Sequence, residues 1–414
     1  MSALKGACAF GQSGGPTAVI NASACGVIET ALKSENISAV YACQNGVKGV
    51  LNDRFYDMGI EDAKEIALLR TTPGAAFGSC RYKLKDIDVD ETDYARIVEV
   101  FKSRNIRYFF YNGGNDSMDT CERISRYCKK VGYECNVIGV PKTIDNDLAL
   151  TDHCPGYASA AKYVATSIAE VSRDLKVYNP SSVVVVEIMG RNAGWLAAGA
   201  ALADVAGEGP DLVYLPEVAF DMDKFLADVK RIYDEKGVCI VAASEGIRDA
   251  SGNFITELLA QNAAATDAFG HTQMGGLAHP LAALINEKLG VKTRGIELSL
   301  LQRCAAHCAS KVDVDEAYAA GKAAVEAALA GQTAQMITFN RVDEGGYKCE
   351  CVLHPLDKIA NEEKLVPREW INDEGNRMNK EFYDYALPLI QGDSHTPTEN
   401  GMPRYAKLKL ELVK

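Results

Sequence analysis

Residues 141–147 read Pro-Lys-Thr-Ile-Asp-Asn-Asp and directly follow the apolar run Val-Ile-Gly-Val at 137–140. Such a run is typical of a strand buried in a parallel sheet, and the polar residues after it predict a turn at the carboxyl end of that strand. Ligands of open α/β sheets bind outside the carboxyl ends of the strands. We therefore expect four polar side chains to reach one cleft together: Lys142, Thr143, Asp145 and Asp147.

A cation, a hydroxyl group and two carboxylates within six residues form a combination suited to phosphoryl transfer. Asp145 is the candidate general base, because this reaction needs a carboxylate that accepts the proton of the attacking hydroxyl. The alternative is an ordinary turn in which residues 145–147 bond to their own backbone. The stretch alone favours that turn, and only the further motifs below favour catalysis.

Short apolar segments alternate with helical segments along the chain. The expected strands are 6–10, 38–43, 107–112, 136–140, 182–188, 211–215, 238–243 and 294–300, and the clearest helices are 16–33, 157–175, 221–235 and 314–330. This alternation predicts an α/β fold with mostly parallel sheets, and a length of 414 residues suits two domains. Segments 335–342 and 347–353 predict a hairpin, whereas the polar tail from residue 357 carries no chemistry that we can assign.

The bulk properties exclude several classes of protein. A net charge of −12 with no long basic block argues against a nucleic-acid partner. No apolar run is long enough to cross a membrane, and no basic and apolar leader precedes the first strand, so we expect a cytoplasmic protein without a membrane partner. The 13 cysteines are odd in number and lack metal-ligand spacing, which favours reduced, packed thiols. His153, His271 and His279 have no partner at a functional spacing and are expected to be structural.

Further motifs follow the ends of other expected strands. Residues 11–16 read Gly-Gln-Ser-Gly-Gly-Pro, 113–117 read Gly-Gly-Asn-Asp-Ser, and 189–194 read Met-Gly-Arg-Asn-Ala-Gly. Ser-Glu-Gly at 244–246 and Gln-Arg at 302–303 complete the series. In the first motif the glycines let the backbone approach an anion, and Pro16 is expected to set the first turn of a helix whose N-terminus faces that anion. In this order the motifs closely resemble those of the phosphofructokinase family, over roughly residues 5–340.

The resemblance implies two Rossmann-like three-layer domains with the active-site cleft between them. It places the donor-binding domain at 1–156 plus about 311–360, and the sugar-phosphate domain at 157–310 plus about 361–414. It implies donor-binding roles for Gly14, Gly15, Arg81, Gly114 and Ser117. It implies acceptor-binding roles for Thr143, Ile144, Asp145, Asp147, Met189, Gly190, Arg191, Glu245, Gln302 and Arg303.

His307 and Lys311 follow the last motif, one and two helical turns beyond Arg303, and are further candidates for phosphate contacts. A plain role as solvated helix residues is equally compatible with their positions. The resemblance also implies Mg²⁺ as cofactor. It further implies a homodimer or homotetramer in which Arg303 reaches a neighbouring subunit's site.

Three positions bear on the phosphoryl donor. The ATP-using members of the family have aspartate and glycine at the positions of Asn115 and Asp116, and glycine at that of Lys142. Asp116 would crowd and repel the α-phosphate of ATP, whereas Lys142 matches the members that use pyrophosphate and can neutralise charge in the transition state. The resemblance therefore implies reversible transfer from pyrophosphate to the 1-hydroxyl of fructose 6-phosphate in glycolysis, with Asp145, Lys142 and Asp116 at catalytic positions.

Asn115 departs from the family pattern, in which an aspartate at this position supports Mg²⁺. Its amide oxygen can still hold the ion or a bound water, or Asp116 or Asp147 takes over more of that task. Three alternatives stay open: an ATP-dependent enzyme of the same family, a kinase of the wider group that acts on NAD or lipids, and a non-catalytic regulatory subunit that binds sugar phosphate. The second group lacks the stretch at 142–147, and the intact Asp145 argues against the third.

Overall fold

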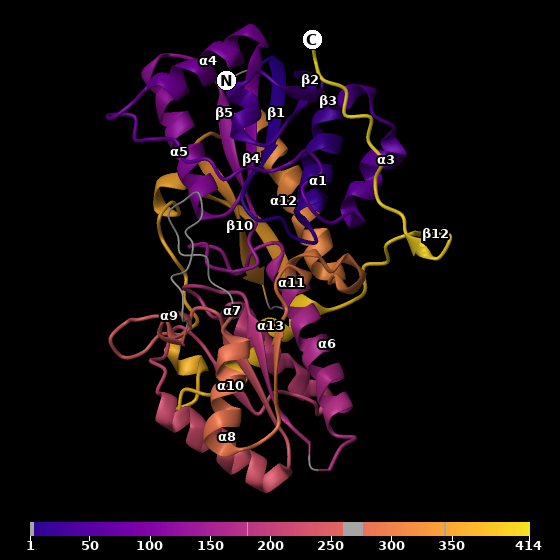
Figure 1. Ribbon diagram of the computed structural model, residues 1–414. Helices are drawn as coiled ribbons and strands as arrows, with labels where there is room; N and C mark the ends of the chain where they lie inside the picture. Colours follow the sequence, from indigo (N-terminus) through magenta and orange to yellow (C-terminus); the bar gives the residue numbers. More distant parts are fainter. Residues whose placement is uncertain (1–3, 180, 260–275, 343–344) are drawn as a thin grey trace.

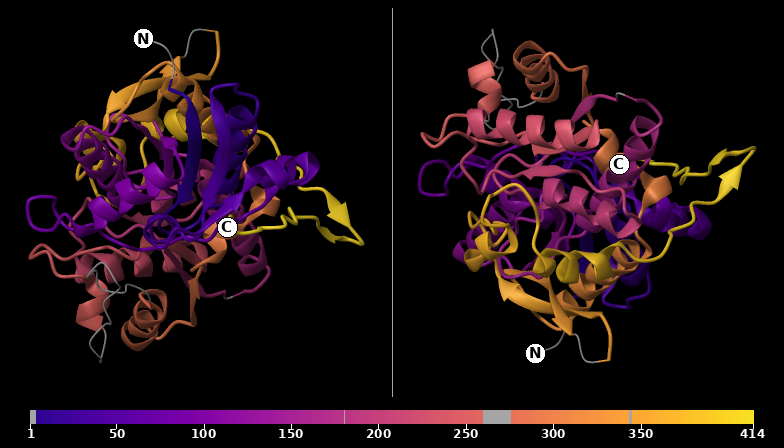
Figure 2. Two further views of the ribbon diagram at one scale, coloured as in Figure 1. Left: turned by 90° about the horizontal axis from the view of Figure 1, so that it is seen from above. Right: turned by 90° about the horizontal axis from the view of Figure 1, so that it is seen from below.

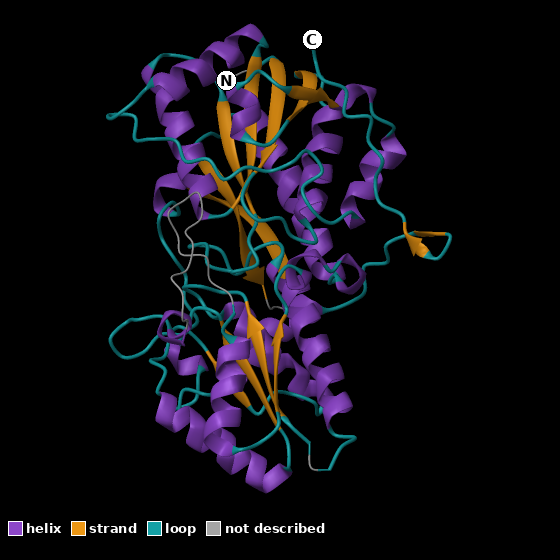
Figure 3. Ribbon diagram, in the orientation of Figure 1, coloured by secondary structure: helices purple, strands orange, loops and turns teal. Residues whose placement is uncertain are grey.

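The computed structural model describes residues 4–179, 181–259, 276–342 and 345–414. It consists of two α/β units, each built on one sheet with helices on both faces (Figures 1 and 3). The predicted α/β class with mostly parallel sheets is therefore confirmed. His271 lies outside the described residues.

The first unit is built on a seven-stranded sheet in the order β11-β10-β5-β4-β1-β2-β3, and its neighbouring strands are parallel except at the edge pairs β2–β3 and β10–β11. The strands are β1 (Gly6–Gln12), β2 (Ile37–Cys43), β3 (Phe55–Asp57), β4 (Ile106–Gly113), β5 (Asn136–Pro141), β10 (Gln335–Val342) and β11 (Lys348–Pro355). The main helices are α1 (Ile20–Leu32), α4 (Thr92–Ser103), α5 (Asn115–Lys130) and α12 (Lys311–Leu329). Val137 packs in the core with α4 and α5, and Ile138 packs in the core with α1 and α12, so both faces of β5 need apolar residues.

The second unit has a four-stranded parallel sheet in the order β7-β8-β6-β9. Its strands are β6 (Val183–Ile188), β7 (Leu212–Tyr214), β8 (Cys239–Ser244) and β9 (Thr293–Glu297). Its helices are α6 (Tyr157–Leu175), α7 (Trp195–Gly199), α8 (Met222–Lys236), α9 (Ile255–Leu259), α10 (Ala278–Leu289) and α13 (Lys380–Ala386). One apolar core joins the sheet to α6, α7 and α13, and a second core joins its other face to α8 and α10.

All eight predicted strands and the predicted hairpin are present, and the remaining short elements were not predicted. They include β3, α7, α9 and α13, and also α2 (Val47–Leu51), α3 (Ala63–Leu68), α11 (Leu301–Cys304), β12 (Thr398–Glu399) and β13 (Met402–Pro403). The expected start of the first helix is wrong. The helix begins at Ile20, because the Thr17 hydroxyl accepts a hydrogen bond from the Val19 amide in a turn that precedes it. Pro16 therefore does not set the first helical turn.

The chain passes between the two units at 142–156, 305–310, 356–366 and 391–397. After the last passage it runs back along the first unit as an extended segment, seen in yellow in Figure 2. There Leu408 and Leu410 pack against the core that contains Ile138, α1 and α12, and Leu412 pairs with Tyr56 of β3. The sequence-based boundaries assigned all of 361–414 to the second unit, and this final segment does not follow them.

Candidate active site

A cleft of about 1280 Å³ lies between the two units, at the carboxyl ends of strands from both sheets. Its walls come from the segments that follow β1, β4 and β5 on one side and β6, β8 and β9 on the other. The predicted site residues that line it are Gly14, Gly15, Arg81, Gly114, Asn115, Asp116, Ser117, Lys142, Thr143, Ile144, Asp145, Asp147, Met189, Arg191, Glu245 and Arg303. The fold thus brings together most of the residues that sequence analysis placed in one cleft.

Lys142 is the central cation on the side of the first unit. Its side chain is buried, and its ammonium group donates a hydrogen bond of 2.6 Å to the carbonyl oxygen of Gly15. Burial lowers the pKa of Lys142 to about 8, while the carboxylate of Asp145 opposes that change. Arg81 and Arg303 also lower this pKa, since they bring further positive charge to the same place. A cluster of three cations at a glycine turn is suited to a compact anion.

Asp145 lies between this cluster and the second unit. Its backbone amide donates to the Thr143 hydroxyl at 3.1 Å, which fixes the turn after β5. Burial raises the pKa of Asp145, and the ammonium of Lys142 counteracts that effect. Burial and the neighbouring Asp145 raise the pKa of Asp147 to about 7. Asp145 is therefore a buried acid that lines the cleft, and a group of this kind can act as a general base.

Asp116 lies at the mouth of the cleft, in the first turn of α5. Its carboxylate is 3.8 Å from the ammonium of Lys83, and its side chain is 44% exposed. An acidic residue at a helix N-terminus is favourable for the helix dipole. Ser117 in the same turn lies so close to Gly113 that a Cβ there would be 2.0 Å from the Ser117 hydroxyl oxygen. Only glycine fits at that position, so this turn keeps its close packing.

The segment after β6 forms the opposite wall. Gly190 has a φ of 138°, a conformation suited to glycine, and its amide donates to the Glu245 carboxylate at 3.3 Å. The Met189 amide donates to the side-chain oxygen of Gln302 at 3.1 Å. Gly190 and Gln302 therefore hold the cleft wall without lining it.

Arg191 and Glu245 offer complementary groups to a ligand on this wall. The Nε of Arg191 is buried, and it has no hydrogen-bond partner within the described part of the chain. A buried N–H group without an acceptor costs free energy, and a bound ligand that accepts its hydrogen bond removes that cost. Burial raises the pKa of Glu245 to about 7, and its carboxylate is placed to accept hydrogen bonds from hydroxyl groups. An anionic group beside a polyol fits this pair.

Arg303 lines the cleft of its own chain. A Cβ on Gly15 would lie 2.7 Å from its guanidinium nitrogen Nη1. The reason is the short helix α11, which follows β9 at the carboxyl edge of the second sheet and faces the glycine turn of the first unit. The expected reach of Arg303 into a neighbouring subunit's site stays a prediction.

His307 and Lys311 are not brought to the cleft. The predicted continuous helix after Arg303 is broken into α11, a single 3₁₀ turn at 306–308 and α12, which begins at Lys311. The ring of His307 packs against Tyr163, with ring centroids 6.2 Å apart, and Lys311 pairs with Asp315. Both residues serve other contacts in this structure.

Comparison with known proteins identifies the family. The Phosphofructokinase family model matches residues 7–296. The chain belongs to the phosphofructokinase family. A protein of Halomonas elongata named pyrophosphate–fructose 6-phosphate 1-phosphotransferase is 47% identical over 98% of this chain and 96% of its own length. A sulfofructose kinase of Alkalicoccus urumqiensis is 34% identical over 88% of this chain and 92% of its own length. The solved structure of a pyrophosphate-dependent phosphofructokinase from Marinobacter aquaeolei has a TM-score of 0.89 at 43% identity, covering 99% of this chain and 97% of that one.

Sequence analysis missed several cleft residues of this phosphofructokinase family member, Asn361 and Glu363 among them. These two residues belong to the polar tail to which no chemistry was assigned. The side-chain amide of Asn115 holds this segment: its oxygen accepts from the Asn361 amide, and its nitrogen donates to the carbonyl of Glu362. No sequence signal marks such a contact, because its partners are 246 residues apart.

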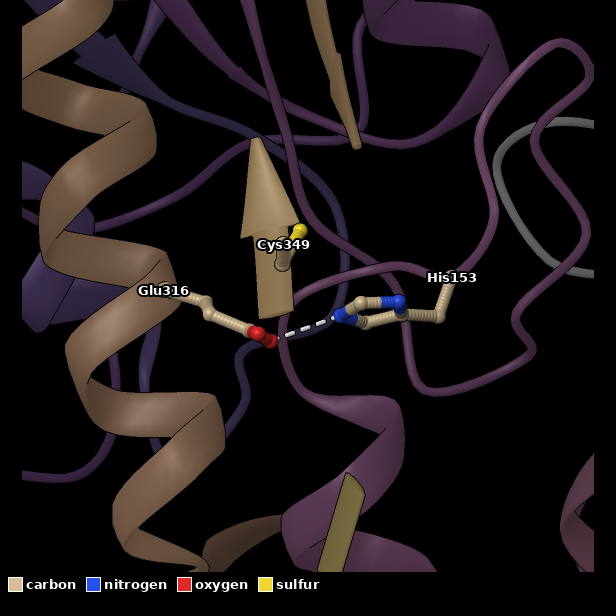
Figure 4. Close-up of side chains that lie close together, drawn as sticks. All are labelled: His153, Glu316 and Cys349. Atoms are coloured by element: carbon tan, nitrogen blue, oxygen red, sulfur yellow. Dashed lines mark hydrogen bonds and ion pairs between the residues drawn. The ribbon is translucent and has the colours of Figure 1, made fainter. Parts of the chain in front are cut away.

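A second cluster of polar side chains lies behind the cleft. His153, Glu316 and Cys349 converge from the loop after β5, from α12 and from β11 (Figure 4). Both ring nitrogens of His153 bond to carboxylates, Nδ1 to Asp152 at 2.8 Å and Nε2 to Glu316 at 2.7 Å. Although burial acts to lower it, these two carboxylates raise the pKa of His153. Because Arg341 also pairs with Asp152, two cations balance two carboxylates, which supports the structural role expected for His153.

In the described ranges of this phosphofructokinase family member, no helix is both long and apolar enough to cross a bilayer. Nine of the 13 cysteines are buried, which confirms the expectation of mostly packed cysteines.

Proposed function

We propose that the protein transfers a phosphoryl group from inorganic pyrophosphate to the 1-hydroxyl of fructose 6-phosphate, reversibly and with Mg²⁺, giving fructose 1,6-bisphosphate and phosphate. The single observation that carries the choice of donor is the placement of Asp116 and Lys142 in one cleft. The buried ammonium of Lys142 lies inside the glycine turn, and the carboxylate of Asp116 stands at the mouth. The names of the Halomonas and Marinobacter relatives agree with this donor.

The side chains divide the chemistry between them. The carboxylate of Asp145 accepts the proton of the 1-hydroxyl while the oxygen of that hydroxyl forms a bond to one phosphorus of pyrophosphate. The bridging oxygen–phosphorus bond breaks, and phosphate leaves. Lys142, Arg81 and Arg303 offset the charge of the phosphates, while Arg191 and Glu245 hold the acceptor. Mg²⁺ would supply further charge neutralisation when bound, and the carboxylate oxygens that line the cleft are ligands of the kind it prefers.

The proposal extends to the arrangement of the protein. The first unit would bind the donor and the second the sugar phosphate, in a cytoplasmic glycolytic enzyme. A homodimer or homotetramer follows the family pattern. In such an oligomer Arg303, which lines the cleft of its own chain, would also lie near a neighbouring subunit's site.

A side-by-side assay of the purified protein with pyrophosphate and with ATP tests this function. We expect turnover of fructose 6-phosphate with pyrophosphate, and loss of that turnover in the double variant Asp116→Gly, Lys142→Gly. Greater activity with ATP would refute the donor, and no activity with either would favour the regulatory subunit. A panel of acceptors that includes sedoheptulose 7-phosphate and sulfofructose then defines the acceptor, since one relative is named a sulfofructose kinase.

A further inference from the structure

Asn146 lies between Asp145 and Asp147 in the turn after β5, but its side chain is not part of the cleft. Both acids line the cleft, whereas Asn146 does not and is fully buried. Its backbone has a φ of 56°, in the left-handed region that asparagine adopts more readily than most residues. The conformation of Asn146 therefore sets the directions in which the two acidic side chains leave the backbone.

The side chain of Asn146 is held at both of its polar ends. Its oxygen accepts a hydrogen bond of 2.9 Å from the Cys154 amide, which ties the turn to the later part of the segment 142–156. Its nitrogen donates at 2.8 Å to the hydroxyl of Tyr385 on α13. An ionised aspartate could accept the first bond but could not donate the second. Asparagine thus satisfies both contacts of this buried position.

Tyr385 brings the C-terminal tail to the segment that carries the candidate catalytic residues. Its hydroxyl accepts from Asn146 and donates at 2.8 Å to the carbonyl oxygen of Asp152, so two hydrogen bonds determine its orientation. Its ring packs against Trp195 and Trp370, with ring centroids 5.3 and 5.2 Å away. The core of the second unit therefore holds the hydroxyl to which the turn after β5 is bonded.

A second residue of the tail bonds to the same segment. The ammonium of Lys364 donates to the carbonyl oxygens of Thr151 and Asp152 at 3.0 and 2.7 Å, and its backbone amide donates to that of Asp147 at 2.7 Å. Lys364 and Tyr385 thus meet at the carbonyl of Asp152. The tail to which sequence analysis assigned no chemistry fixes the segment 142–156 from behind the cleft.

We propose that Asn146 and Tyr385 are positioning residues for phosphoryl transfer, and that the buried hydrogen bond between them fixes the directions of Asp145 and Asp147 in the cleft. This inference rests on the proposed function. Neither Asn146 nor Tyr385 lines the cleft, so neither contacts a substrate there. Loss of the bond would leave both substrates bound but the general base misplaced. A misplacement of about 1 Å can lower a rate by about 10²-fold, so the effect falls on kcat rather than on KM.

The variants Tyr385→Phe and Asn146→Gly test this role. The first keeps the ring and removes the hydroxyl, and the second keeps access to the left-handed backbone and removes both hydrogen bonds. We expect each to lower kcat with pyrophosphate by about 10- to 100-fold, with the KM of either substrate changed by less than about twofold. The two losses should not multiply in the double variant, because each change removes the same bond.

Tyr383→Phe is the matched control. Tyr383 lies on the same helix, but its hydroxyl donates to the carboxylate of Asp204 and not to the segment 142–156. Its kcat should equal that of the unchanged protein. Should Asn146→Gly fail to fold, Tyr385→Phe decides alone, because it preserves the packing of the ring.

Hydrogen exchange of the segment 142–156, followed by mass spectrometry, tests the anchor apart from catalysis. Exchange should be faster in Tyr385→Phe and Asn146→Gly than in the unchanged protein, and unaltered in Tyr383→Phe. Unaltered exchange, or an unaltered kcat beside a lower melting temperature, would overturn the inference and leave the proposed function intact. Faster exchange in both variants of a protein that turns over neither pyrophosphate nor ATP would support the anchor and refute only the proposed function.

Discussion

The ammonium group of Lys142 bonds to the carbonyl oxygen of Gly15 at 2.6 Å, so the segment after β5 is tied to the glycine turn after β1. The contact holds a buried cation against a glycine turn whose backbone an anion can approach closely. Because the pKa of this cation is lowered to about 8 by burial, its charge depends on pH in the working range.

The first prediction concerns that charge. Above a pH of about 8 Lys142 becomes neutral, so the affinity for pyrophosphate should fall by about tenfold per pH unit, as the loss of one proton requires. The KM for pyrophosphate, measured from pH 6.5 to 9.5 at fixed free Mg²⁺, reports this. Lys142→Arg keeps its charge over that range and should flatten the profile. An identical profile in this variant would show that another group titrates.

Asp145→Asn should lower kcat by about 10²- to 10⁴-fold, because the amide keeps the shape of the side chain but cannot take the proton of the 1-hydroxyl. Binding of fructose 6-phosphate, measured by calorimetry, should change little. A variant that keeps a tenth or more of the activity would remove Asp145 from the role of general base.

The position of Arg303 gives a test between subunits. If it serves its own chain, co-expression of Arg303→Ala with Asp145→Asn should restore no activity, since every cleft lacks one of the two groups. If the arginine acted on a neighbour, mixed oligomers would contain clefts with both groups. Activity of the co-purified mixture, compared with each variant alone, decides between the two arrangements, and any clear gain would show that Arg303 acts on a neighbouring subunit's site.

The cluster around His153 should contribute stability that depends on pH. Its pKa in the folded protein is raised above the ordinary value of 6.5, so its contribution is complete below about pH 6.5 and is lost as the pH rises through the folded value. His153→Gln should cost about 3 kcal/mol at pH 6 and less at pH 9. Urea midpoints at both pH values measure this, with the exposed His279→Gln as control. If the destabilisation by His153→Gln grew with pH, the stabilising form of His153 in the folded protein would not be the charged imidazole.

The strands and most of the cleft could be predicted because both depend on local patterns. A continuous apolar run marks a buried strand, and the polar residues after it must lie at the carboxyl edge of the sheet. Lys142, Asp145, Arg191 and Glu245 all follow such runs, and all four line the cleft.

The errors arise where contacts distant in the sequence decide the outcome. His307 and Lys311 were placed by helical spacing, but the helix after Arg303 ends within a few residues. Glu363 was missed since an irregular segment has no period, and its position depends on the side chain of Asn115 far earlier in the chain. Nothing in the local sequence records that bond.

The repeated passage of the chain between the two units has a mechanical consequence. Segments 142–156, 305–310, 356–366 and 391–397 act as parallel tethers, so opening or closing of the halves must bend all of them together. A protease nick in one tether would leave the halves joined by the others. Neither half corresponds to a contiguous gene fragment, which makes the pair inseparable by simple truncation.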